Sequence, residues 1–188
     1  EAMLCFGGLK AWEGLRVMAR EACRPFSAGR GGMVQGEGAA VLVFEDRDHA
    51  LARGAPILAE VLGAGMASDA HDIVMPSQAG AERVMRRALA DAQCTPEQIG
   101  YINAHGTGTG ANDKIESAAI HAVFGDSPPP VSSTKSMHGH AIGATGAIEM
   151  LACLLALREG VLPPTLGWTG RDPDCLADVV PNEARRAQ

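Results

Sequence analysis

The sequence is poor in aromatic side chains and has no excess of basic ones. Aromatic residues make up 4% of its 188 positions, and 16 Lys and Arg are outnumbered by 22 Asp and Glu, for a formal net charge of −6. Because a nucleic-acid-binding face needs clustered positive charge, this composition argues against a nucleic-acid partner. A hydrophobic fraction of 46% with 20% charged residues is typical of a folded globular domain.

Long hydrophobic runs and cysteine pairs are also missing. No apolar run reaches the roughly 18 residues of a membrane-spanning helix, and the longest candidate, residues 141–157, contains Glu149. The short apolar start, Met3 to Phe6, does not predict a signal peptide. Five cysteines without a Cys-x-x-Cys motif indicate free thiols in a cytoplasmic protein and give no expectation of a metal site. The glycine-rich stretch 31–38 lacks the ending of a P-loop, so we expect a structural turn packed against an active site.

Apolar runs alternate with amphipathic segments along the chain. Asn112 is expected to cap one of the helices. The segment 141–157 is apolar almost all round, which predicts a buried helix. This alternation indicates an α/β layered fold. The pattern predicts strands at 39–45, 57–66, 101–104 and 131–134, and helices at 80–93, from 112 onward and at 141–157.

Two histidines occupy similar positions in the predicted fold. His105 lies in a glycine-rich turn after the strand 101–104, and His140 lies in another after the strand 131–134, with Lys135 between them. Open α/β sheets place their ligand sites where strands end, so we expect one shared pocket. Neutral imidazoles donate N–H bonds to negative charge that develops on a substrate oxygen.

Two groups of charged residues need an explanation. Glu149 is the only charge in the apolar segment 141–157, and a carboxylate buried alone is costly, so we infer an ion pair with Lys135. The alternative is an exposed position for Glu149. Arg16, Arg20 and Arg24 recur every four residues and would share one helix face, which is either solvated or a docking patch for an acidic partner.

Taken together, several segments give the chain a specific family resemblance. The sequence resembles the elongating β-ketoacyl-[acyl-carrier-protein] synthases of the thiolase-like superfamily over essentially its whole length. The resemblance implies a thiolase-like αβαβα fold, with residues 1–54 ending its N-terminal half and 55–188 forming an incomplete C-terminal half. It rests on GGMVQGEGAAVLVFE, MASDAH, IGYINAHGTGTGANDKIE, SSTKSMHGHAIGATGAIEMLACLLALREGVLPPT and DVVPNEAR in this order.

The resemblance also assigns a reaction and residue roles. Members of this family lengthen an acyl chain by decarboxylative Claisen condensation of an acyl thioester with a malonyl thioester on acyl carrier protein. They need no cofactor beyond the phosphopantetheine of the carrier, and the resemblance implies a cytoplasmic homodimer. By this resemblance His105 and His140 are catalytic histidines, Lys135 the active-site lysine and Glu149 its acidic partner, while Asp113 and Glu116 form a structural acidic pair.

The resemblance implies two departures from the family: the segment with the nucleophilic cysteine would precede Glu1, and the family's closing glycine-rich loop would follow Gln188. None of its five cysteines matches the family's nucleophile, and the chain begins at Glu1, so we expect a fragment without condensing activity of its own. GTGTGAND is closer to the nodulation-type synthases of rhizobia, which implies acyl chains for lipo-oligosaccharide signals and a peripheral association with the inner membrane. The alternatives are a catalytically silent chain-length-factor-like partner of a polyketide ketosynthase, a coenzyme A-dependent thiolase or an interaction module.

Overall fold

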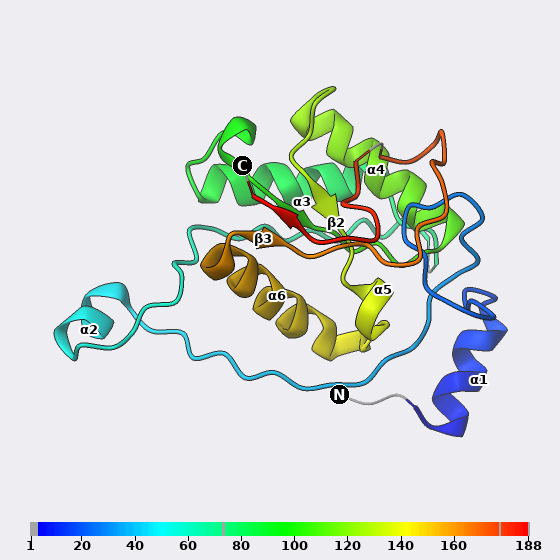
Figure 1. Cartoon of the computed structure of the whole chain (residues 1–188), viewed down its shortest axis with the longest axis horizontal. Coiled ribbons are helices and arrows are strands. Elements are labelled where there is room, and N and C mark those ends of the chain that lie inside the picture. The colour runs from blue at the N-terminus through cyan, green and yellow to red at the C-terminus, as the bar shows by residue number, and fades with distance from the viewer. Residues whose placement is uncertain (1–3, 73, 177, 188) are drawn as a thin grey trace.

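The computed structural model describes residues 4–72, 74–176 and 178–187 as an α/β chain with helices on both sides of short strands. Figure 1 shows α3 and α4 packed on one side of β2 and β3, with α5 and α6 on the other. The predicted α/β layered fold is therefore confirmed. Its elements are α1 Phe6–Gly14, α2 Arg47–Ala52, α3 Gln78–Asp91, the 3₁₀ turn η1 Pro96–Gln98, β1 Ile102–Asn103, α4 Gly110–Phe124, β2 Val131–Ser132, α5 Lys135–His138, the 3₁₀ turn η2 Ile142–Ala144, α6 Thr145–Glu159, β3 Val161–Leu162 and β4 Arg185–Arg186.

The two strands that matter for the site run parallel. Ile102 of β1 pairs with Val131 of β2, and Asn103 pairs with Ser132. Parallel strands end at the same edge of a sheet, so the turns that follow β1 and β2 meet there. The other sheet pairs β3 with β4 in antiparallel register.

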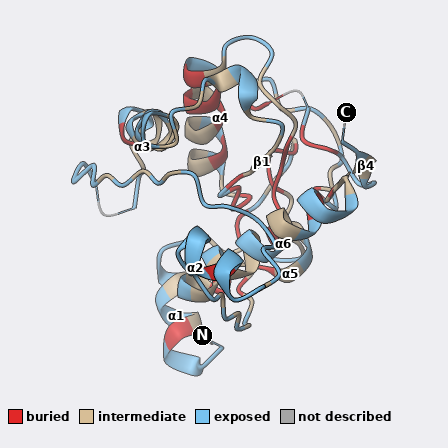
Figure 2. Cartoon of the chain, turned by 90° about the vertical axis from the view of Figure 1, so that its left-hand side faces the viewer, coloured by how far each residue is buried: buried red, intermediate tan, exposed pale blue. Residues whose placement is uncertain are grey.

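The core lies around β1, β2 and α4. Its apolar side chains come from segments far apart in the sequence, and Figure 2 shows buried residues concentrated on α4 and near β1. The central members are Phe26, Ala104, Ile120, Val131, Leu176 and Val179. Removing these side chains from water is the main stabilising contribution here.

The residue that caps the N-terminus of α4 differs from the prediction. Thr109, and not the predicted Asn112, is its N-cap, and the Thr109 side chain accepts a hydrogen bond from the Asn112 N–H at 3.4 Å. The Asn112 side chain is instead turned toward two carboxylates of α4. The prediction missed Thr109 because both residue types cap helices, and only tertiary contacts decide between them.

For the described residues, two predicted strands are wrong, and so is the prediction that the helix at 141–157 is buried. Segments 39–45 and 57–66 form no strand among the described residues, and Val41 and Val43 are 91% and 81% exposed. An apolar run becomes a strand only when another strand takes up its backbone hydrogen bonds. Likewise α6 is exposed along much of its length, including Leu151 and Leu157. The expected helix face shared by Arg16, Arg20 and Arg24 is also wrong, because α1 ends at Gly14. The division at residue 54 remains a prediction.

Candidate active site

His105 lies two residues after the end of β1, in a turn held by a carboxylate of α4. The backbone N–H groups of His105 and Gly106 donate to the two oxygens of Glu116, at 2.7 and 2.8 Å. Gly106 has a φ of +40°, and a Cβ there would meet the Ser133 side chain at 2.5 Å, so only glycine fits this turn. Burial raises the pKa of Glu116, while the N–H donors of the turn oppose that shift.

Asp113 connects a second set of backbone groups to the same turn. Its carboxylate accepts the Phe26 N–H at 2.7 Å and the Gly108 N–H at 3.2 Å, and lies 3.6 Å from the Arg30 guanidinium. Phe26 has a left-handed φ of +59°, and this hydrogen bond helps to hold that strained backbone. Burial raises the pKa of Asp113, and its hydrogen bonds and Arg30 lower it in part. Asp113 and Glu116 thus contact the backbone around His105.

Lys135 and Glu149 form the inferred ion pair. The Lys135 side chain is fully buried, and its Nζ donates to Glu149 Oε1 and to the carbonyl oxygen of His105, both at 2.5 Å. Burial raises the pKa of Glu149, and Lys135 opposes that shift. The prediction of an ion pair is confirmed, and the lysine ties α6 to the turn that carries His105.

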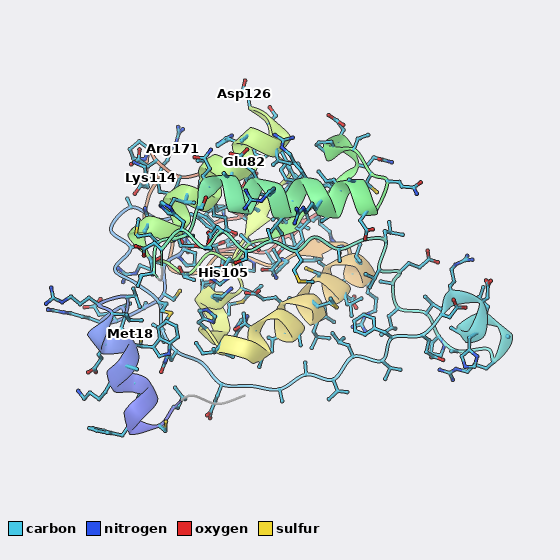
Figure 3. The ribbon with its side chains drawn as sticks, turned by 180° about the vertical axis from the view of Figure 1, so that it is seen from behind. Met18, Glu82, His105, Lys114, Asp126 and Arg171 are labelled. Atoms are coloured by element: carbon cyan, nitrogen blue, oxygen red, sulfur yellow. The ribbon has the colours of Figure 1, made fainter. Side chains whose placement is uncertain are left out.

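The two histidines of the predicted pocket lie side by side. Their ring centroids are 5.3 Å apart with an interplanar angle of 84°. The backbone around His140 is held by Val34, whose carbonyl oxygen accepts the His140 N–H at 2.8 Å. Figure 3 shows His105 below the α3–α4 layer, near α5. The structure thus brings His105, His140 and Lys135 together, as the sequence pattern predicted.

One ring nitrogen of His140 has a defined role. The backbone N–H of Ile142 donates to Nδ1 of His140 at 3.1 Å, and the Thr145 hydroxyl lies 3.1 Å from the same atom. A nitrogen that accepts a backbone N–H carries no proton, so the neutral ring carries its proton on Nε2. The sequence analysis missed Ile142, because a backbone donor leaves no signature in residue type, and it missed Thr145, whose hydroxyl is brought to His140 by the turn at residues 141–144.

Both imidazoles are neutral at pH 7. The pKa of His105 is lowered to about 3, first by burial and then by the charges of Lys135 and His140. The pKa of His140 is lowered to about 4, again mainly by burial and then by Lys135. His105 is exposed and lines the cavity, and its ring has an edge-to-face contact with the ring of His140. The pair therefore offers N–H donors and no positive charge.

A cavity of about 650 Å³ opens in front of the histidines. Gly31, Gly32 and Met33 line it, as expected of a glycine-rich turn packed against a site. Thr107 and Thr109 add hydroxyl groups that the sequence analysis did not single out, although the spacing Thr-x-Thr after His105 was visible. The remaining wall includes Trp12, Leu15, Val17, Val74, Met75 and Pro76.

No cysteine among the described residues lines this cavity. Burial raises the pKa of the thiols of Cys23 and Cys175 to about 11, and it also raises the pKa of Cys153. A reactive cysteine has a lowered pKa, so these three thiols are poor nucleophiles. The Cys23 thiol donates to the Thr107 carbonyl oxygen at 3.3 Å, which is a structural contact.

Residues 58–169 match the C-terminal domain of the beta-ketoacyl synthases. The chain belongs to the beta-ketoacyl synthase family. Among relatives of this family, it is 56% identical to nodulation protein E of Rhizobium leguminosarum bv. trifolii over 98% of the chain and 47% of that protein. It is 45% identical to 3-oxoacyl-[acyl-carrier-protein] synthase 2 of Coxiella burnetii over 97% of the chain and 46% of that protein. The chain thus spans just under half of these beta-ketoacyl synthases.

Solved ketosynthases share the fold described above. The ishigamide ketosynthase/chain length factor superposes with a TM-score of 0.95 and 47% identity, covering 98% of this chain and 46% of that one. A beta-ketoacyl synthase from Burkholderia phymatum gives a TM-score of 0.94 at 39% identity, over 98% and 47% of the two chains. The chain therefore has the fold of the C-terminal half of a thiolase-like ketosynthase.

Proposed function

We propose that this chain supplies the histidine and lysine part of the active site of a 3-oxoacyl-[acyl-carrier-protein] synthase. The reaction is the elongation of an acyl chain by decarboxylative condensation with a malonyl thioester. The observation that carries the proposal is the neutral pair His105 and His140, with the proton of His140 fixed on Nε2 by the Ile142 N–H. The synthase relatives named above support the same reaction.

The geometry suits the decarboxylation step. When the carbon–carbon bond to the malonyl carboxylate breaks, carbon dioxide leaves and the electron pair moves into an enolate of the thioester. Two N–H donors aimed at the enolate oxygen stabilise this charge without transferring a proton. A protonated imidazole would stabilise the negatively charged substrate as well as the transition state. Such stabilisation of both states lowers the barrier less.

The second half of the reaction needs an acyl thioester within reach of the carbanion. The carbanion attacks the acyl carbonyl carbon, the new carbon–carbon bond forms and a thiolate leaves. None of the described cavity-lining residues is a cysteine, so we propose that the acylated cysteine comes from another part of the protein. The expectation that these 188 residues alone lack condensing activity stays a prediction.

Lys135 acts through position and charge in this proposal. Its Nζ donates to the carbonyl oxygen of His105 and pairs with Glu149, so it fixes the turn that presents the imidazole. Burial is the main cause of the lowered pKa of both histidines, and the positive charge of Lys135 adds to it. We propose supporting roles for three carboxylates. Glu149 pairs with Lys135, while Asp113 and Glu116 hold the backbone of the turn at residues 105–108.

The biological setting is part of the same proposal. Several nodulation proteins E are 51 to 56% identical to this chain, against 45% for the Coxiella synthase, which favours a nodulation-type acyl chain. A ketosynthase of similar structure has been solved with its acyl-carrier protein, and we propose that carrier as the partner here. Among the described residues, none of the helices combines the length and the hydropathy that a membrane span requires. Cytoplasmic localisation, a homodimer, peripheral membrane association and the absence of a cofactor stay predictions.

Malonyl decarboxylation by the full-length protein tests the proposal. The variants His105→Asn and His140→Asn should each lower the rate of carbon dioxide release from malonyl-carrier thioester by about 100-fold or more, since each removes one donor to the enolate. Asp126→Asn, on an exposed turn after α4, is the control and should keep the wild-type rate. Full decarboxylation by either histidine variant would contradict the proposal.

Assay of the condensation product separates the alternative. A catalytically silent chain-length-factor-like partner lacks the acylated cysteine and would form no 3-oxoacyl thioester, even where the histidines release carbon dioxide from the malonyl thioester. One solved relative is a ketosynthase/chain length factor assembly, so the shared fold does not decide between the two. The buried Lys135 and the fixed proton of His140 favour the catalytic function, because a silent subunit has no use for them.

A further inference from the structure

The hydroxyl of Thr145 has a single hydrogen-bond partner, and that partner is the imidazole of His140. Thr145 is the first residue of α6, is only 4% exposed, and its Oγ1 lies 3.1 Å from Nδ1 of His140. No other group in the described part of the chain bonds to this hydroxyl. We propose that Thr145 is a positioning residue, whose hydroxyl donates to Nδ1 and so aims the Nε2–H of His140 at the enolate oxygen. This inference deepens the proposed function and rests on it.

The direction of this hydrogen bond follows from a neighbouring donor. The Ile142 N–H already donates to Nδ1 of His140 at 3.1 Å, so this nitrogen carries a lone pair and no proton. A hydroxyl that contacts such a lone pair donates to it. A buried hydroxyl whose proton finds no acceptor is costly, and Nδ1 is the acceptor that the described residues offer to Thr145. The Thr145 proton therefore points at the ring.

Helix capping does not account for this threonine. Ala144 is the N-cap of α6, and no side chain there bonds to the free N–H groups of the first turn. Thr145 lies one position inside the helix, where a β-branched residue has a lower helix propensity than alanine. Its hydroxyl contacts the imidazole instead. The contact thus contributes to the site rather than to the start of the helix.

The two donors at Nδ1 have different functions. The Ile142 N–H belongs to the backbone and cannot accept, so it decides which ring nitrogen carries the proton. The Thr145 hydroxyl comes from another element, and this second contact restricts rotation of the ring about the first hydrogen bond. Rotation matters because the N–H groups of His105 and His140 must converge on one oxygen. Thr145 therefore acts through the orientation of His140.

Decarboxylation by variants of the full-length protein tests this function. Thr145→Val keeps the shape of the side chain and removes the donor. We expect kcat for carbon dioxide release from malonyl-carrier thioester to fall about tenfold, the rate equivalent of one hydrogen bond, with KM unchanged. Thr145→Ala also lacks the hydroxyl and suits the helix better, so it should behave in the same way without any folding defect of valine. Thr145→Ser keeps the hydroxyl and should have a kcat near that of the wild type.

A matched control shows whether the effect is specific to this hydroxyl. Thr169→Val is the same chemical change at an exposed position. The Thr169 hydroxyl bonds to the Ser27 hydroxyl and the Ala28 carbonyl oxygen, and Thr169 is not among the residues that line the cavity. This variant should keep the wild-type kcat.

A nitrogen-15 spectrum separates positioning from stability. In histidine-labelled protein, the ring signals of His140 are those that the variant His140→Asn lacks. A hydrogen bond to an unprotonated ring nitrogen lowers its resonance frequency. Loss of one donor should therefore move the Nδ1 resonance of His140 to higher frequency in Thr145→Val and Thr145→Ala, and leave it in place in Thr145→Ser.

Each outcome supports or overturns the inference. A lower kcat without the hydroxyl, recovery in Thr145→Ser and the shifted Nδ1 resonance together support it. Wild-type kcat in Thr145→Val, an equal loss in Thr145→Ser, or an Nδ1 resonance that does not move overturns it and leaves the proposed function standing. If the folded wild type releases no carbon dioxide, the proposed function fails and the inference fails with it.

Discussion

Two regions of similar apolar character differ in how far they are buried in this chain. Residues 101–140 carry short strands whose backbone is paired and whose turns are held by Asp113 and Glu116. Residues 37–66 are rich in valine and leucine, yet they run exposed along the molecule and around α2 (Figure 1). Val131 is fully buried, whereas Val43 is 81% exposed. Apolar composition thus favours burial, but contact partners decide whether it occurs.

The largest effect is expected from the carboxylate that organises the well-packed region. Asp113→Ala removes the acceptor of the Phe26 and Gly108 N–H groups and leaves the buried Arg30 with one partner fewer. We expect a loss of about 4 kcal/mol in the free energy of unfolding, measured by urea denaturation. Asp126→Ala, at an exposed position, is the control and should cost less than about 0.5 kcal/mol. Equal costs for the two variants would mean that Asp113 does not organise the turn.

The Lys135–Glu149 pair should come next. Glu149→Ala leaves the fully buried ammonium with the His105 carbonyl oxygen, and we expect a cost of about 3 kcal/mol. The double variant Lys135→Met/Glu149→Leu should cost less than the sum of its single variants, because it removes both charges. The exposed pair Lys10–Glu13 serves as control, and Lys10→Ala should change stability by less than about 1 kcal/mol. Strict additivity of the two substitutions would rule out coupling across the buried pair.

A matched pair of valines compares the two regions directly. In the 188-residue chain, Val131→Ala should cost about 2 kcal/mol, because it leaves a cavity beside Phe26 and Ile120. Val43→Ala should change the free energy of unfolding by less than about 0.5 kcal/mol, since this side chain is exposed. Urea denaturation of both variants provides the comparison. The outcome can differ in a longer form of the protein. If Val43→Ala destabilises that form as much as Val131→Ala does, another part of that protein covers residues 37–66.

The smallest effect concerns pH. The folded pKa values of His105 and His140, about 3 and about 4, lie below the ordinary value of 6.5, so the unfolded chain binds more protons between these limits. Their contribution to stability is complete above about pH 6.5 and is lost as the pH falls toward 4. After allowance for solvent screening we expect a loss of about 1 kcal/mol per histidine at pH 5.

Comparison with histidine variants isolates this contribution. The raised pKa values of Asp113, Glu116 and Glu149 act in the opposite direction, so the wild-type curve alone is a sum. The variant His105→Gln/His140→Gln should lose less stability than the wild type between pH 6.5 and 5, as followed by urea denaturation. Parallel curves for the two proteins would contradict the neutral state of the histidines.

Much of the site was readable from residue types and their positions. His105 and His140 each follow a predicted strand, and parallel strands bring their following turns together. The partner of Glu149 could be predicted because a carboxylate in an apolar helix needs a nearby cation, and Lys135 lies in the segment that leads into that helix. These inferences succeeded because they depend on local pattern and on the cost of burying charge.

Other features were decided only by tertiary structure. The proton position of His140 depends on the Ile142 backbone N–H, which any residue there would supply. Thr109 caps α4 in place of Asn112, because the side-chain amide of Asn112 donates to Asp113 and Glu116. Residues 39–45 have the composition of a strand, but hydrogen bonding and burial require a neighbour, and none lies beside them in the described chain. The sequence by itself determined which residues could do chemistry, and tertiary contacts determined their protonation, their orientation and which apolar segments are buried.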